Sequence, residues 1–130
     1  MLTEIIDRLI ALLGPIAAAS RERRNESDAA LSAASIALNA TRLYWRDLDR
    51  GEQRSPETER QLVLYWSAAA IAIRHFDPDL AIRFEEKAEY WVSPESYSPQ
   101  EVTDLGLRLD DLSRAYRDQL RPRQIGRRRG

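Results

Sequence analysis

Three prolines in this chain stand between a residue of the kind that caps helices and a stretch with apolar residues at helical spacing. The three pairs are Ser55-Pro56, Asp77-Pro78 and Ser98-Pro99. Proline fits the first position of a helix, because its φ angle is already helical and its missing N–H is not needed there. A serine or aspartate before it can accept a hydrogen bond from the open helix end. Helices are therefore predicted to begin at Pro56, Pro78 and Pro99.

The apolar residues recur every three or four positions, which is the spacing of one face of an α-helix. This spacing runs through four stretches of the sequence, residues 2–16, 31–48, 62–76 and 102–116. No stretch shows the alternation of apolar and polar residues that strands between hairpin turns would have. The sequence therefore predicts an all-α protein, folded as an antiparallel helical bundle of four to five helices.

Glycines and prolines set the expected ends of the helices. Gly14-Pro15 is predicted to break or kink the first helix, because a proline inside a helix removes one hydrogen bond. The next helix then extends from Pro15 to about Asp49, unless residues 25–27 interrupt it, and Gly51 ends it. The remaining helices are predicted from Pro56 to Phe76, from Pro78 to about Tyr90, and from Pro99 to about Leu120.

Length and charge divide the chain into a body and a tail. Its 130 residues, 43% of them hydrophobic, match a single helical-bundle domain, which we expect over residues 1–120. Residues 121–130 are predicted to form a basic flexible tail, because they hold too few apolar side chains to pack. Such a charge attracts phosphates, so the candidate residues for a nucleic-acid contact are Arg121, Arg123, Arg127, Arg128 and Arg129, although we favour a solvated tail that only aids solubility.

The residue inventory excludes several kinds of chemistry. The chain has no cysteine and a single histidine, which rules out disulfide scaffolds, thiolate metal sites and histidine-rich zinc sites. Its five glycines are scattered and form no phosphate-binding loop. We therefore expect no metal, no cofactor and no catalysis. The absence of cysteine also favours a cytoplasmic protein, because small secreted domains usually carry disulfides. No apolar run approaches the roughly 20 residues that span a bilayer, so we expect no membrane insertion.

The residues around Asp77 are the strongest candidate for a ligand site. An arginine, a histidine and two carboxylates meet there, and further along two cations precede a tryptophan at one-turn spacing, which could hold an anion. The candidate residues are Arg74, His75, Asp77, Arg83, Lys87 and Trp91. We favour a simpler interpretation, in which Asp77 caps a helix and the cations lie on a solvated helix face.

The first helix is apolar on two faces. One face carries Ile5, Leu9 and Leu12, and the other carries Ile6, Ile10 and Leu13. A helix that lies on a bundle normally buries a stripe a little wider than about 100°, so one bundle is not expected to cover both faces. We therefore predict an oligomer interface at Ile6, Ile10 and Leu13.

The tryptophans Trp45 and Trp66 fall in the core register of their helices and are predicted to be buried. As a whole, the sequence favours a non-catalytic helical interaction module, an oligomeric adaptor or accessory protein whose partner is itself or another protein. Two alternatives stay open. One is a nucleic-acid-associated bundle that uses the arginine tail, and the other is a ligand-sensing or enzymatic site between Arg74 and Trp91.

Overall fold

The computed structural model describes residues 2–17, 21–93, 95 and 97–120, and this part of the chain contains five helices and no strand. The helices are α1 (Leu2–Ala17), α2 (Arg21–Asp49), α3 (Pro56–Ile73), α4 (Pro78–Val92) and α5 (Pro99–Leu120). The predicted all-α helical bundle is therefore confirmed. Within the same ranges, no helix has both the length and the apolar character needed to cross a membrane.

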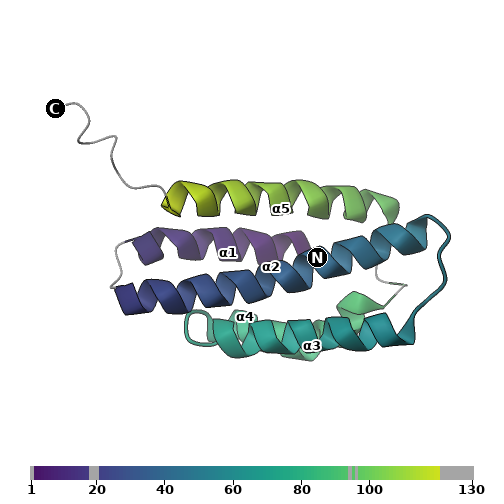
Figure 1. Ribbon diagram of the computed structural model, residues 1–130, viewed down its shortest axis with the longest axis horizontal. Helices are drawn as coiled ribbons and strands as arrows, with labels where there is room; N and C mark the ends of the chain where they lie inside the picture. Colours follow the sequence, from purple (N-terminus) through teal and green to yellow (C-terminus); the bar gives the residue numbers. More distant parts are fainter. Residues whose placement is uncertain (1, 18–20, 94, 96, 121–130) are drawn as a thin grey trace.

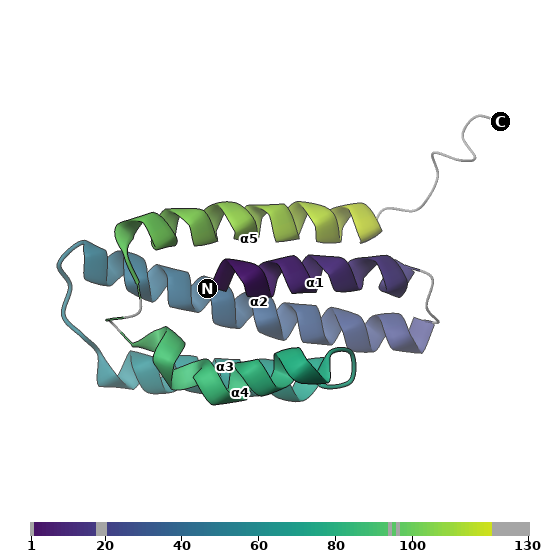
Figure 2. The same cartoon turned by 180° about the vertical axis from the view of Figure 1, so that it is seen from behind.

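The longest of the described helices, α2, lies in the middle of the bundle (Figure 1). It packs against α1 and α5 on one side and against α3 on the other, and α4 packs along α3. Each helix runs antiparallel to the next one in the sequence, whereas α1 and α5 lie side by side and point in the same direction (Figure 2). The last helix therefore closes the bundle against the first.

The three predicted helix starts are confirmed at Pro56, Pro78 and Pro99. At each start, the side chain before the proline accepts a hydrogen bond from a backbone N–H three residues further on. Ser55 Oγ accepts from Thr58 N at 3.1 Å, Asp77 Oδ1 from Leu80 N at 3.1 Å, and Ser98 Oγ from Glu101 N at 3.2 Å. These bonds satisfy N–H groups that have no partner inside the helix, which fixes where each helix begins.

The helices end close to their predicted positions. Gly51 turns the chain after α2, as predicted, with φ +95°, a left-handed conformation that glycine adopts without strain. α3 ends at Ile73 and not at the predicted Phe76, because Phe76 N and Asp77 N both donate to the Ile73 carbonyl, at 2.8 and 2.9 Å, and form a turn. α4 ends at Val92, within two residues of its predicted end.

Of the predicted break or kink at Gly14-Pro15, the break is wrong, because α1 continues through both residues to Ala17. Pro15 stands in the last turn of α1, so the hydrogen bond that it removes lies near the helix end and not across the packed middle. α2 accordingly begins at Arg21. Residues 25–27 do not interrupt α2, since Ser27 is buried and its hydroxyl donates to the Arg23 carbonyl at 2.9 Å.

The expectation that α1 keeps a free apolar face is also wrong. Its buried residues come from both faces, and they are Leu2, Ile5, Ile6, Leu9 and Leu13. Ile10 and Leu12 are partly buried against the same core. α1 contacts α2, α4 and α5, and three neighbouring helices cover a wider arc than one stripe. Of the residues predicted at an oligomer interface, Ile6 and Leu13 are therefore buried inside the single chain and Ile10 is partly buried.

Trp45 and Trp66 are buried as predicted, with 2% and 0% of their surfaces exposed. Trp66 packs against Phe84 and Trp91 of α4, with ring centres 4.8 and 4.7 Å away. Trp45 stacks on Tyr97 at 5.9 Å and so connects α2 to the residues just before α5. Aromatic pairs at such distances add to the stabilisation from burial alone, so these rings set how the helices pack around α2 and α3.

Candidate functional site

Asp77, one of the predicted ligand residues, connects two helices. Its carboxylate caps α4 and also accepts hydrogen bonds from Arg8 of α1, whose Nη2 lies 2.6 Å from both oxygens. Arg74 and His75 are exposed, and the His75 carbonyl accepts a hydrogen bond from Arg23 at 3.1 Å. The junction therefore connects α1 to the start of α4, which supports the capping interpretation.

Trp91 is not available to a ligand on the surface of α4. Its indole is 7% exposed and packs against Trp66 in the core. Arg83 and Lys87 are exposed, and Lys87 Nζ lies 5.8 Å from the centre of the Tyr90 ring. Each step of four residues turns about 40° around a helix, so two steps carry the series from solvent into the core. The structure does not bring Arg83, Lys87 and Trp91 together as an anion site.

The candidate arginines for a nucleic-acid contact are Arg121, Arg123, Arg127, Arg128 and Arg129, and they lie outside the described residues. Across residues 2–17, 21–93, 95 and 97–120, no group of three or more His, Cys, Asp or Glu could hold a metal ion. A candidate site on this part of the chain therefore has to come from the hollows of its surface.

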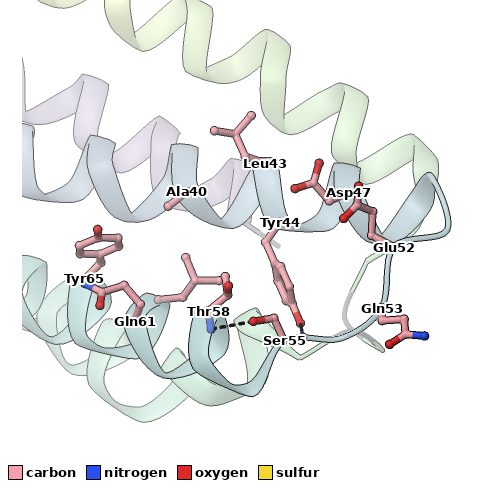
Figure 3. A pocket seen from close by; sticks show the side chains of 11 residues that line it. Ala40, Leu43, Tyr44, Asp47, Glu52, Gln53, Ser55, Thr58, Gln61 and Tyr65 are labelled. Atoms are coloured by element: carbon pink, nitrogen blue, oxygen red, sulfur yellow. Dashed lines mark hydrogen bonds between the residues drawn. The ribbon is translucent and has the colours of Figure 1, made fainter.

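A hollow of about 370 Å³ opens between α2 and α3 near the loop that connects them (Figure 3). In Figure 3, Tyr44 points from α2 toward this loop. Its hydroxyl accepts a hydrogen bond from Ser55 N at 3.0 Å and donates one to Glu59 at 2.5 Å. Arg54 donates two further bonds to the same carboxylate, at 3.0 and 2.8 Å. These polar groups fix the loop between α2 and α3.

The same contacts set the protonation states in this corner. Hydrogen bonds from Arg54 first, and then from Tyr44, lower the pKa of Glu59 below its ordinary value. Burial first, and then the hydrogen bond to Glu59, raises the pKa of Tyr44. Glu59 is therefore ionised and Tyr44 neutral near pH 7. Because Glu59 already accepts hydrogen bonds from both Tyr44 and Arg54, these groups hold the two helices in place and form no reactive pair.

A second hollow, of about 400 Å³, lies between α3 and α4 on the surface of the bundle. Ile71 of α3 and Ile82 of α4 line it, with 55% and 52% of their surfaces exposed. Leu64, which is 63% exposed, stands two turns before Ile71 on the same side of α3. We call these three residues the α3–α4 apolar face. Apolar side chains gathered on one surface mark sites of interaction.

Charged residues stand at the two ends of this groove. Arg74 and Pro78 line it where α3 turns into α4, and Glu85 and Glu86 line it about two turns further along α4. None of the ion pairs found within the described ranges involves Arg74, Glu85 or Glu86. The groove therefore has a basic end, an apolar middle and an acidic end.

The α3–α4 apolar face was not predicted from the sequence, although the positions of Leu64 and Ile71 indicate it. The helical spacing correctly assigned Leu62, Trp66 and Ile73 to the core of α3, where all are buried. Leu64 and Ile71 fall outside that spacing, on the opposite side of the helix. Large apolar residues outside the core register of a surface helix are the pattern that would have pointed to an interaction surface.

No protein-family model, curated protein or solved structure matches this chain. The fold does not identify the function, because helical bundles occur in proteins with many unrelated functions. The function has to follow from the residues on the surface of the bundle and from the contacts that they make or leave unmade.

Proposed function

We propose that this chain is a non-catalytic interaction module that pairs with a second copy of itself through the α3–α4 apolar face. The observation that carries the proposal is the groove flanked by Ile71 and Ile82, both more than half exposed. Single exposed apolar residues are common, but two that line one groove form a patch. Full burial of an exposed isoleucine contributes about 1.5 to 3 kcal/mol, and each of these two is about half exposed, so a partner that covers both gains about that amount in total.

The charges of the groove favour a second copy as that partner. In a two-fold symmetric dimer the same patch meets itself in the reversed direction, so the basic end of one copy faces the acidic end of the other. Arg74 of one copy would then lie opposite Glu85 and Glu86 of the other, with the isoleucines between them. Such charge pairs contribute more to orientation than to strength, so the apolar residues supply most of the affinity.

The polar side chains at the helix junctions are already bonded within the chain. Asp77 caps α4 and pairs with Arg8, while Glu59 is held by Tyr44 and Arg54. These contacts stabilise the bundle, whereas the side chains of the α3–α4 apolar face remain more than half exposed. A dimer formed through that face would carry α5, which lies on the opposite side of α2 (Figure 1), on its outer sides, where further proteins could bind, which is the arrangement of an adaptor.

Sedimentation equilibrium tests the proposed pairing. The wild-type chain is expected to be dimeric at tens of micromolar. The double variant Ile71→Glu, Ile82→Glu is expected to be monomeric with an unchanged far-UV circular dichroism spectrum. Ile36→Glu is the matched control, because Ile36 is an isoleucine of α2 that is 49% exposed outside the groove. This variant should remain dimeric.

Charge reversal tests the orientation of the two copies. Arg74→Glu should weaken the dimer, and so should the double variant Glu85→Arg, Glu86→Arg. The triple variant should recover affinity, because opposite charges again face each other across the interface. The proposal is overturned by a wild type that stays monomeric at hundreds of micromolar, or by an Ile36→Glu variant that dissociates as fully as the double isoleucine variant.

A further inference from the structure

Three arginines line one hollow between α2 and α5. Arg42, Arg46 and Arg50 follow one another at four-residue spacing and therefore share one side of α2 and of the turn that follows it. The hollow has a volume of about 550 Å³, within the range of small-molecule sites, and α5 lines it with residues that include Thr103 and Gly106. Figure 1 shows α5 on the opposite side of α2 from α3 and α4, so this hollow is separate from the α3–α4 apolar face.

Gly106 of α5 lies beside Arg42 in the hollow. A Cβ at Gly106 would stand 3.4 Å from Cδ and 3.6 Å from Nη1 of Arg42, so the arginine passes close to α5 where the glycine has no side chain. Glycine inside a helix costs roughly 0.5 to 1 kcal/mol relative to alanine. These distances to Arg42 are ordinary van der Waals contacts, so they show that α5 packs against the Arg42 side chain and do not require a glycine at this position.

The guanidinium groups of Arg42 and Arg46 are partly removed from water without gaining an acceptor. The Nε atoms of both are buried, and neither donates a hydrogen bond within the part of the chain that the structure describes. By contrast, Arg8 and Arg54 pair with carboxylates at 2.6 and 2.8 Å. A buried donor without a partner costs about 1 to 3 kcal/mol, and reduced screening by water strengthens the attraction of these cations for an anion.

Acidic residues balance these charges only in part. Asp49 and Asp110 also line the hollow, and among the described residues no ion pair joins either of them to the three arginines. The lining therefore carries three positive and two negative charges. Pro99, the first residue of α5, and Asp49, the last residue of α2, both line the hollow, so the positive end of one helix dipole and the negative end of the other offset each other and the arginines supply the basic character.

We infer that this hollow binds the phosphate group of a small phosphorylated molecule. A phosphate monoester carries close to two negative charges and three terminal oxygens, and each guanidinium can meet two such oxygens with paired N–H donors. A carboxylate has only two oxygens and one charge, so it would leave part of the arginine set without a partner. Asp49 and Asp110 could accept hydrogen bonds from hydroxyl groups in the rest of the molecule. A sugar phosphate has this chemistry.

Isothermal titration calorimetry on the full chain at low salt tests the site. Glucose 6-phosphate and inorganic phosphate are the probes, and glucose is the neutral comparison, which should not bind. Arg46→Gln is expected to weaken glucose 6-phosphate binding at least about ten-fold, because it removes charge-assisted hydrogen bonds. Arg50→Gln should weaken it by a smaller factor. Because Arg50 is exposed, Arg50→Gln should leave the fold intact, so it tests the site even if Arg46→Gln disturbs the fold.

Matched variants separate this hollow from the other arginines. Arg60→Gln removes an exposed arginine of α3, and the triple variant Arg127→Gln, Arg128→Gln, Arg129→Gln removes three charges near the C-terminus. Both should leave the affinity unchanged. Tighter binding of glucose 6-phosphate than of inorganic phosphate supports a monoester ligand. The inference is overturned if neither probe binds at millimolar concentration, if inorganic phosphate binds as tightly as the monoester, or if binding survives Arg46→Gln and is lost in the triple variant.

Discussion

Trp66 of α3 donates a 2.9 Å hydrogen bond from its indole Nε1 to Thr41 Oγ1 of α2, in the centre of the bundle. Thr41 is also a donor, because its hydroxyl gives a 2.7 Å bond to the Ala37 carbonyl. Both residues are 0% exposed, so water does not compete for these groups. The bond therefore fixes the position of α3 along α2 and satisfies the single polar atom of a large core side chain.

Thr41→Val is expected to destabilise the protein by about 1 to 3 kcal/mol, because it leaves the buried Trp66 N–H without an acceptor and hardly changes the packed volume. Urea unfolding followed by tryptophan fluorescence measures this free energy. Thr103→Val, at an exposed position of α5, is the matched control and should change it by less than about 0.5 kcal/mol. A Thr41→Val protein as stable as the wild type would contradict the assigned role of the bond.

Trp66→Ala should cost about 3 to 5 kcal/mol, since removal of a large core side chain leaves a cavity. That cavity would border Phe84 and Trp91, which pack against Trp66 at 4.8 and 4.7 Å. Thermal unfolding followed by circular dichroism measures the loss. Tyr90→Ala removes a ring that is 63% exposed and should cost less than about 1 kcal/mol. Equal effects of the two variants would show that burial does not set the cost.

Glu59→Gln should lower the free energy of unfolding at pH 7, and it should lower it less at acidic pH. The hydrogen bonds from Arg54 lower the pKa of Glu59 in the folded protein, so the folded state takes up this proton less readily than the unfolded chain. The resulting stabilisation is complete above the ordinary glutamate pKa of about 4.3, and it is lost as the pH falls through the lower folded value.

Urea unfolding of the wild type and of Glu59→Gln at neutral pH and near pH 3 measures this difference. The gap between the two proteins should narrow on acidification. Glu57→Gln, an exposed glutamate of the same helix turn, should show a small gap at both pH values. A gap between wild type and Glu59→Gln that stays constant with pH would mean that the carboxylate charge is not what stabilises the corner.

The helix starts and the core were predictable because their causes are local. Ser55, Asp77 and Ser98 each cap a helix within three residues of themselves, and these contacts do not depend on the rest of the fold. The burial of α1 could not be predicted from such local causes. Its two apolar faces were visible in the sequence, but their burial depends on α4 and α5 returning to α1, which local spacing does not contain.

The surface sites depend on contacts between distant segments, so the sequence alone did not reveal them. Arg42 and Gly106 meet only because α5 closes beside α2, and Ile71 and Ile82 share a groove only because α3 and α4 pack together. For the residues from Arg74 to Trp91, by contrast, the sequence suggested a shared site that the structure does not form. One-turn spacing suggested a shared face, yet the gradual rotation of that face around the helix carries Trp91 into the core.

Gly51 and Gly106 are expected to respond to alanine in opposite directions. Gly51 has φ +95°, and a Cβ there would meet nothing within 4 Å, so Gly51→Ala carries only the strain of a left-handed backbone, about 1 to 2 kcal/mol. Gly106 lies inside α5 with no such φ, and its new Cβ would make an ordinary contact with the flexible side chain of Arg42 at 3.4 Å. Gly106→Ala should therefore stabilise the protein by about 0.5 to 1 kcal/mol, because alanine favours the helix and restricts the unfolded chain.

Chemical unfolding of the two single variants beside the wild type measures both effects under one set of conditions. Gly51→Asn is a useful third variant, because asparagine adopts the left-handed region more readily than alanine and should recover part of the loss. A Gly51→Ala protein with wild-type stability would mean that α2 ends as well in another turn. A destabilised Gly106→Ala protein would mean that Arg42 cannot shift, and hence that its guanidinium is held rigidly against α5 before any anion binds.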